Sequence, residues 1–391
     1  MLFAFTGGRG HLDPLVPIAR AAAAAGHTVA FASTPSMVPT VGSLGFEAFP
    51  IGRPGSGKPP PRLPLRPVDI EREEREFRER FAGGGARERA PGVLALCKVW
   101  QPDVLVIDET DFGSMLAAES AGRPYASVVV LIASGSFTRP DLIGEELDVL
   151  RAEYGLPPDP ELQMLSRHLV LAPGPPSLRN PDYPLPSTAH SFRPAATPDG
   201  GAGTPPWPVA LPDSPTVYFT LGTVFNIESG DLFARVLAGL GELQVNVIAT
   251  TGDWIDPAEF GPLPAHVRVE QFVPQASVLP YSNVVVSHAG SGSLLGALAH
   301  GLPQVLIPLG ADQPFNAARC EALGVARVLD AVEVTPELIR HEVSTVLENT
   351  AYRTRAERLR DELAALPGPE SAVGLLEELA TTIHARHRTS R

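Results

Sequence analysis

Residues 282–324 read SNVVVSHAGSGSLLGALAHGLPQVLIPLGADQPFNAARCEALG. Two continuous apolar runs, VVVSH and QVLIPL, each end in a turn of small or polar residues, and each turn leads into a stretch of helical composition. Apolar runs separated by helices are typical of parallel strands that are buried on both faces of a sheet. The segment therefore predicts a strand–helix–strand–helix unit of an α/β fold.

The same alternation extends through most of the 391 residues. Further strand-like runs lie at 2–7, 28–33, 104–109, 125–131, 216–223, 245–251 and 267–272. A stretch rich in Pro and Gly, without periodicity, interrupts the pattern at 193–215 and indicates a linker. We therefore expect two Rossmann-like, doubly wound parallel-sheet domains that face a central cleft, with ligands at the carboxyl ends of the strands. The expected division is an N-terminal domain at 1–200, a linker at 201–214, a C-terminal domain at 215–370 and a terminal helix or tail at 371–391.

Composition argues against several classes of protein. The net charge of −13 is unsuited to nucleic acid, because binding a phosphate backbone needs clustered Lys and Arg. Cys97 and Cys320 are too few for a disulfide framework or a Cys-based metal site, and they fit a reducing cytoplasm. No apolar run approaches the ~18 residues of a membrane span, and the first residues lack the positive head of a signal peptide. We expect a cytoplasmic protein, either a monomer or a homodimer.

A dinucleotide site is disfavoured at GGRGHLD (7–13), although Gly8 and Gly10 follow a strand and precede a helix. The third glycine of the fingerprint falls at Asp13, and an acid is unfavourable beside a pyrophosphate. The ribose-binding acid expected ~20 residues further on is also missing, since 30–38 offers only Ser and Thr.

The turn after VVVSH is suited to phosphate. His288 stands at the carboxyl end of the strand, and the turn into the next helix is made by Ala289, Gly290, Ser291, Gly292 and Ser293. A helix start presents unpaired N–H groups and a partial positive charge, and small residues let phosphates come close. Taken alone, the turn also fits a simple capped helix. In the next turn, Asp312 and Gln313 offer an acceptor and an amide that suit the vicinal hydroxyls of a sugar, so together the turns predict a nucleotide-sugar site.

These residues also carry a family resemblance. FVPQASVL (272–279) followed by SHAGSGSLLGALAHGLPQVLIPLGADQPFNA (287–317) closely resembles the donor-binding motif of the family 1 glycosyltransferases. GHLDPLVPIARAAAAAGHTVAFAST (10–34) resembles the N-terminal signature of that family, in particular of the actinobacterial enzymes that decorate macrolides and aromatic polyketides. The resemblance implies the two-domain GT-B fold, in which the C-terminal helix commonly crosses back onto the N-terminal domain.

The resemblance also implies roles for individual residues. Phe272 would stack on the base, His288 and Ser293 would contact the diphosphate, and Asp312 with Gln313 would bind the sugar. Further positions matching the donor site are Gly222, Thr223, Val273 and Gln275. Gly296 stands where the plant enzymes have a glutamate on the ribose hydroxyls, which favours dTDP-sugars. The Asp312–Gln313 pair goes with glucose in plant enzymes and favours UDP-sugars instead.

His11 is the candidate general base. It lies at a helix start directly after the first strand, and a histidine with an ordinary pKa of ~6.5 suits proton transfer. The resemblance assigns the same role to the histidine of the family's Gly-His-x-x-Pro motif; a helix-capping role is the alternative. Asp108 best matches the carboxylate that orients the base, with Asp111 as the second candidate and Glu109 expected on the opposite face.

No Asp-x-Asp triplet, the usual diphosphate-metal motif, occurs in the chain, so we expect no metal and no other cofactor. The predicted function is inverting transfer of a sugar from a dTDP- or UDP-sugar to a hydrophobic small-molecule acceptor. A nucleotide-sugar 2-epimerase and a non-catalytic nucleotide-sugar-binding partner are the alternatives. Variable loops within 52–90 and 132–170 are expected to shape the acceptor pocket, with the Arg- and Glu-rich stretch at 71–89 forming a surface helix.

Overall fold

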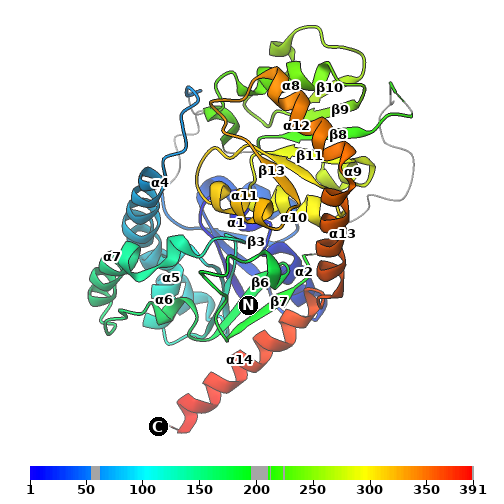
Figure 1. The fold of residues 1–391 in the computed structure, drawn as a ribbon. Coiled ribbons are helices and arrows are strands. Elements are labelled where there is room, and N and C mark those ends of the chain that lie inside the picture. The colour runs from blue at the N-terminus through cyan, green and yellow to red at the C-terminus, as the bar shows by residue number, and fades with distance from the viewer. Residues whose placement is uncertain (54–61, 195–209, 212, 223–224, 390–391) are drawn as a thin grey trace. The chain divides into compact units, whose positions relative to one another are not determined.

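The computed structural model describes residues 1–53, 62–194, 210–211, 213–222 and 225–389. The chain divides into two compact units (Figure 1). Unit 1 consists of Met1–Gly57, Glu71–Pro194 and Leu366–Arg391, and unit 2 consists of Lys58–Ile70 and Ala195–Ala365. The expected linker at 201–214 lies mostly outside the described residues.

Unit 1 is built on a parallel sheet of strand order β3-β2-β1-β4-β5-β6-β7. The strands are β1 (Leu2–Ala4), β2 (Ala30–Ser33), β3 (Glu47–Pro50), β4 (Leu105–Asp108), β5 (Tyr125–Val128), β6 (Leu169–Pro173) and β7 (Ala189–Phe192). The helices are α1 (Arg9–Leu12), α2 (Val16–Ala24), α3 (Val38–Ser43), α4 (Ile70–Phe77), α5 (Ala86–Trp100), α6 (Phe112–Ser120), α7 (Pro140–Glu153) and α14 (Glu370–Thr389). Central β1 is apolar throughout because β2 and β4 flank it and both its faces are covered.

The last helix of the chain belongs to unit 1. In α14, Ala372, Val373 and Leu376 are buried in the same core as the strands of unit 1. At the surface, His27 Nε2 lies 2.9 Å from Glu377 Oε1, next to the contact between α14 and α2. The chain therefore returns to its first domain after completing unit 2.

Unit 2 has a parallel sheet of strand order β10-β9-β8-β11-β12-β13. Its strands are β8 (Thr216–Thr220), β9 (Asn246–Thr250), β10 (Val267–Glu270), β11 (Val284–Ser287), β12 (Gln304–Leu306) and β13 (Ala326–Val328). Its helices are α8 (Leu232–Gly241), α9 (Gln275–Val278), α10 (Ser291–Ala299), α11 (Gln313–Ala322), α12 (Pro336–Glu348) and α13 (Thr350–Ala365). Alternate residues of β8 enter different cores: Phe219 packs with α8 and α12, and Tyr218 packs with α10. Both units are thus doubly wound α/β sheets, as the sequence predicts.

Two segments differ from the sequence-based expectation. Lys58–Ile70, expected within an N-terminal domain of 1–200, belongs to unit 2. Arg62 forms a two-pronged ion pair with Glu259 (2.6 and 2.9 Å), and the Leu63 N–H donates to the Ile227 carbonyl (2.9 Å). Leu65 packs against the core of unit 2. These contacts hold the segment on unit 2, although its neighbours in sequence belong to unit 1.

The Arg- and Glu-rich stretch at 71–89 is not simply a surface helix. It forms α4, a π-helix over Arg78–Gly85 and the start of α5. Phe77 is buried, with its ring 6.0 Å from Phe112 and 4.9 Å from Phe137, and Arg89 is buried as well. Because most of their neighbours in sequence are charged, the pattern does not reveal that these two residues face the protein interior.

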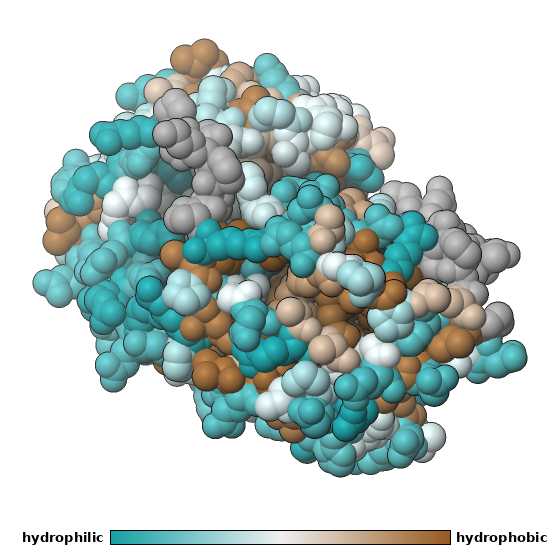
Figure 2. Space-filling model, turned by 90° about the horizontal axis from the view of Figure 1, so that it is seen from above, coloured by the Kyte–Doolittle hydropathy of each residue, from teal (hydrophilic) through white to brown (hydrophobic). Residues whose placement is uncertain are grey.

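Hydrophilic residues predominate on the face shown in Figure 2, with hydrophobic residues in smaller patches among them. Among the described residues, no helix combines the length and the apolar character that crossing a membrane would require.

Candidate functional site

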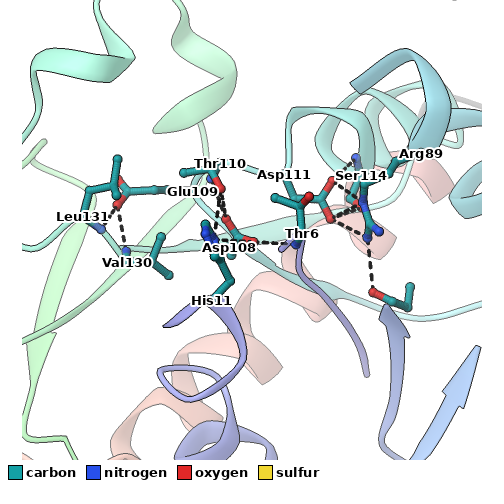
Figure 3. Close-up of polar contacts among 11 residues, drawn as sticks. Thr6, His11, Arg89, Asp108, Glu109, Thr110, Asp111, Ser114, Val130 and Leu131 are labelled. Carbon is teal, nitrogen blue, oxygen red and sulfur yellow. Dashed lines mark hydrogen bonds and ion pairs between the residues drawn. The ribbon is translucent and has the colours of Figure 1, made fainter. Parts of the chain in front are cut away.

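Four consecutive polar residues, 108–111, begin at the last residue of β4, and their side chains have different partners (Figure 3). Asp108 is completely buried at the strand end. Its Oδ2 accepts a hydrogen bond from the Thr6 N–H (2.8 Å), and its Oδ1 accepts from the N–H (2.7 Å) and the hydroxyl (2.6 Å) of Thr110. This carboxylate is therefore fixed by groups from two strand ends.

His11 lies against this carboxylate. Its Nδ1 is 3.4 Å from Asp108 Oδ2 and 3.2 Å from Thr110 Oγ1, and its side chain remains 21% exposed. The imidazole stacks on Phe81 with ring centroids 5.9 Å apart. Gly7 (φ +76°) leaves room for the ring, since a Cβ there would lie 2.9 Å from His11 Cδ2. The histidine is thus held on three sides and still accessible.

The environment keeps Asp108 ionised. Burial alone would raise the pKa of this carboxyl, but the charge of His11 acts against it, as do hydrogen bonds from His11, Thr110 and the Thr6 N–H. The pKa of Asp108 therefore lies below its ordinary value. An ionised carboxylate beside Nδ1 orients the imidazole and would stabilise its positive charge on proton uptake.

Asp111, the second candidate carboxylate, has other partners. It accepts from Arg89 Nη2 (2.7 Å) and Nε (3.0 Å), and from the N–H (3.1 Å) and hydroxyl (2.7 Å) of Ser114. Asp111 thus caps α6 and neutralises a buried arginine of α5. Of the two aspartates, the structure places Asp108 beside His11.

Glu109 points away from His11, as the alternation of a strand predicts (Figure 3). Its Oε1 accepts from the N–H groups of Val130 (2.7 Å) and Leu131 (2.6 Å). Burial raises the pKa of Glu109 to about 7, against the opposing charge of Arg179 and these two hydrogen bonds. Glu109 thus holds the segment that follows β5.

In unit 2, His288 is buried at the end of β11 between two glycines. A Cβ on Gly222 (φ +73°) would lie 2.5 Å from His288 Nε2, and a Cβ on Gly290 would lie 2.4 Å from it. Burial lowers the pKa of His288 to about 4, so the imidazole is neutral at physiological pH. Its Nδ1 is buried and has no hydrogen-bond partner among the described residues. Both glycines are required by the ring that lies between them.

The turns after β11 and β12 are joined by side chains. Asp312 Oδ2 accepts from the Ser291 hydroxyl (2.7 Å) and from Asn316 Nδ2 (2.8 Å), and Asn316 also donates to the Ala289 carbonyl (2.9 Å). Ala289 (φ +65°) and Ala311 (φ +50°) adopt left-handed conformations that cost non-glycine residues energy. Strained backbone of this kind clusters at ligand sites. Within the part of the chain that the structure describes, no side chain caps the start of α10 at Gly290.

The remaining predicted donor residues lie around these turns. Gln275 Nε2 donates to Ser293 Oγ (3.0 Å), and Gln313 Oε1 accepts from the Leu309 N–H (2.8 Å). Phe272 is 64% exposed, Val273 is half-buried, and a Cβ on Gly292 would meet no atom within 4 Å. Thr223 lies outside the described residues.

Gly296 lies against Gln275. A Cβ at this position would lie 3.0 Å from Gln275 Oε1 and 3.1 Å from Leu279 Cδ1. A glutamate here would therefore require Gln275 to move. In the part of the chain that the structure describes, no cluster of three or more His, Cys, Asp or Glu residues is arranged to hold a metal ion.

Comparison with known proteins identifies the family. Residues 234–379 match the model of the Erythromycin biosynthesis protein CIII-like, C-terminal domain. Over 423 aligned residues, the chain is 30% identical to 4'-demethylrebeccamycin synthase from Lentzea aerocolonigenes, covering 97% of this chain and 99% of the relative. The chain belongs to the natural-product glycosyltransferases. It is also 29% identical to 10-deoxymethynolide desosaminyltransferase from Streptomyces venezuelae, covering 97% of this chain and 95% of that relative.

Solved structures place this glycosyltransferase in the GT-B fold. Spinosyn rhamnosyltransferase SpnG, complexed with thymidine diphosphate, superimposes with a TM-score of 0.78 at 25% identity, covering 96% of this chain and 99% of that one. The family and the fold expected from the sequence are therefore confirmed. The chain is an enzyme of the hexosyltransferase class that acts in natural-product biosynthesis.

Three polar residues of the glycosyltransferase escaped the sequence-based prediction. Thr110 contacts both His11 and Asp108, Arg89 pairs with Asp111, and Asn316 joins the two donor-side turns. Thr110 stands among three predicted acids, and Asn316 lies one helical turn after Asp312, so spacing could have suggested both. Arg89 gave no such signal, because it lies in a run of exposed charges.

Proposed function

We propose that the enzyme transfers a sugar from a dTDP-sugar to a hydroxyl of a hydrophobic natural product, inverting the anomeric centre, with His11 as general base. The observation that carries this proposal is the accessible imidazole of His11 beside the buried, ionised Asp108. The Nδ1 atom faces the carboxylate, which leaves Nε2 to accept the proton of the acceptor. The carboxylate then stabilises the imidazolium, as in other histidine–aspartate pairs.

One displacement step accounts for inversion. The acceptor oxygen forms a bond to the anomeric carbon, the bond from that carbon to the diphosphate oxygen breaks, and the hydroxyl proton passes to Nε2 of His11. Because the attack comes from the face opposite the leaving diphosphate, an α-linked donor yields a β-glycoside. No covalent intermediate is needed.

The start of α10 is the proposed diphosphate site. The sequence contains no Lys or Arg between Arg268 and Arg319, so the segment that contains this turn contributes neither side chain to the phosphates. The uncapped helix N-terminus offers N–H groups and a partial positive charge, and the neutral His288 offers one further donor. These groups would also stabilise the charge that develops on the departing diphosphate, so we propose that no metal is required.

Two features favour dTDP over UDP. Gly296 has no side chain to bind the ribose hydroxyls, and a larger residue there would have to displace Gln275 or Leu279, so a 2′-deoxyribose loses no contact at this position. SpnG, which superimposes over almost its whole length, is complexed with thymidine diphosphate. The Asp312 carboxylate and the Gln313 amide, at the adjacent turn, are the proposed contacts of the sugar hydroxyls.

The aromatic residues beside His11 support a hydrophobic acceptor. Phe81 lies on the imidazole and stacks on Phe77 with centroids 4.9 Å apart. The buried rings of Phe112 and Phe137 continue this cluster. An apolar aglycone placed here would bring its hydroxyl to the base.

Calorimetric titration of the purified enzyme with dTDP and with UDP, each in EDTA, tests the donor site. We expect micromolar binding of dTDP and weaker binding of UDP. Tighter binding of UDP would overturn the argument from Gly296. Binding that appears only when magnesium replaces EDTA would overturn metal independence, and no binding of either nucleotide would overturn the donor site itself. Product NMR then gives the anomeric configuration.

A further inference from the structure

We propose that Thr110 is a positioning residue that sets the tautomer and the orientation of His11. Its hydroxyl lies between the two members of the pair, 3.2 Å from His11 Nδ1 and 2.6 Å from Asp108 Oδ1 (Figure 3). The inference rests on the proposed role of His11 as the base.

Counting protons fixes the direction of both hydrogen bonds. A threonine hydroxyl carries one hydrogen, and an ionised carboxylate can only accept. At 2.6 Å, the short contact with the buried Asp108 identifies the carboxylate as the partner to which the Thr110 hydroxyl donates. The same oxygen can then only accept from His11, so Nδ1 must carry the hydrogen. The lone pair that takes the proton of an acceptor hydroxyl is then that of Nε2.

The distances make Thr110 the closer partner of the imidazole. The direct separation of 3.4 Å between His11 Nδ1 and Asp108 Oδ2 exceeds the ordinary range of about 2.7–3.2 Å for N–H···O bonds. Asp108 Oδ2 already accepts from the Thr6 N–H at 2.8 Å. The hydroxyl at 3.2 Å lies at the limit of the ordinary range. Thr110 thus links the Asp108 carboxylate to the imidazole of His11 through its hydroxyl.

The threonine is itself firmly placed. Its backbone N–H and its hydroxyl both donate to Asp108 Oδ1. The backbone and the side chain of Thr110 are therefore both held by Asp108. Thr110 is 1% exposed, so water has little access to replace its hydroxyl. Valine has the same shape without the hydroxyl and would keep the backbone hydrogen bond, whereas serine keeps the hydroxyl. Valine and serine at this position therefore provide one variant that removes the hydroxyl and one that keeps it.

Ring ¹⁵N NMR of the full-length protein measures the tautomer without any substrate, and His11→Ala identifies the His11 signals. We expect His11 to be predominantly the Nδ1–H form in the wild type. In Thr110→Val, the ratio of the Nδ1–H to the Nε2–H form should fall about 3- to 10-fold, the worth of one hydrogen bond. Thr110→Ser should restore it, and Thr382→Val on the exposed face of α14 should change nothing.

An unchanged tautomer ratio in Thr110→Val, in a variant whose melting temperature shows that it folds, would overturn the inference. So would a wild type with Nε2–H predominant. A lower melting temperature alone, with the ratio intact, would reduce Thr110 to a structural role. The turnover of His11→Ala tests the two proposals separately. Full activity of this variant would contradict the role of His11 as general base, independently of the tautomer ratio measured by NMR.

Discussion

The turn after β4 in unit 1 and the turn after β11 in unit 2 lie at equivalent strand ends but differ in residue composition. The first contains three acids and a threonine, all held by hydrogen bonds or ion pairs inside the protein. The second contains glycines, alanine and serines beside a neutral His288 whose Nδ1 has no partner among the described residues. Among the described residues, the side chains of the first turn have partners within the protein, whereas no side chain caps the helix N-terminus at the second.

This difference matches the two halves of the proposed reaction. Moving a proton requires a base whose position and charge are set in advance, and buried carboxylates do that. Binding a diphosphate requires close approach of backbone N–H groups, and small residues allow it. The changes considered below each act on one of the two turns.

His11→Ala should have the largest effect. Removing a general base lowers kcat by about 10²- to 10⁴-fold, because the acceptor hydroxyl must then lose its proton to water. The dTDP affinity measured by calorimetry should stay the same, since His11 lies in α1 of unit 1 and not in the turn after β11. His27→Ala is the matched control, because His27 pairs at the surface with Glu377. Turnover of His11→Ala within tenfold of the wild type would contradict the assignment.

Asp111→Asn and Asp108→Asn should fail in different ways. Loss of the Asp111 charge leaves Arg89 buried without its partner, and breaking such a pair costs about 3–5 kcal/mol of the free energy of unfolding. Urea unfolding measures this loss. Asp108→Asn should lower kcat strongly at a stability that still permits assay, because its partner His11, unlike Arg89, is not a permanent cation. A variant of Asp111 with normal stability and no turnover would reverse the two roles.

The turns differ in how far the sequence predicts them. Apart from Gly222 and Thr223, the predicted donor-site residues lie within 272–317, so one long motif indicates fold, family and ligand class together. The contacts of Asp108 are not contiguous: Thr6 and His11 reach it from about a hundred positions away. The sequence made Asp108 the first candidate and Asp111 the second, but it could not exclude Asp111, because that depends on where Arg89 lies.

The composition of a segment also does not show which of its residues are buried or what they contact. Arg89 stands in a run of alternating Arg and Glu that fits a solvated helix, and only the packed structure shows its pairing with Asp111. In the same way, the Pro-rich sequence around Arg62 is typical of a loop and does not indicate which domain holds it. Such residues are placed by distant partners rather than by local periodicity.

Glu109→Gln should remove a pH dependence that belongs to unit 1. The pKa of Glu109 rises from its ordinary value of 4.5 to about 7 in the folded protein. The group therefore favours the folded state below pH 4.5, and this contribution is lost as pH rises through about 7. At about 1.4 kcal/mol per pKa unit, the loss is on the order of 3 kcal/mol.

The measurement compares urea unfolding of the wild type and Glu109→Gln at pH 5 and pH 8. Glutamine keeps an oxygen for the Val130 and Leu131 N–H groups but carries no charge toward Asp108 or Arg179. The wild type should lose more stability than the variant between the two pH values. Equal losses would show that Glu109 titrates as it does in the unfolded chain.

Two alanine substitutions in the turn after β11 should distinguish glycines that make room for His288 from glycines that make room for the ligand. In Gly290→Ala the new Cβ would lie 2.4 Å from His288 Nε2, so the imidazole must shift, and dTDP affinity should fall about tenfold, or ~1.4 kcal/mol. In Gly292→Ala the Cβ meets no atom of the described residues within 4 Å, so any loss of dTDP affinity reports contact with the ligand itself. The ring ¹⁵N signals of His288 should change only in the first variant. If Gly290→Ala bound dTDP like the wild type, then the glycine would serve only the packing of His288, and the diphosphate would be held by α10 without the histidine.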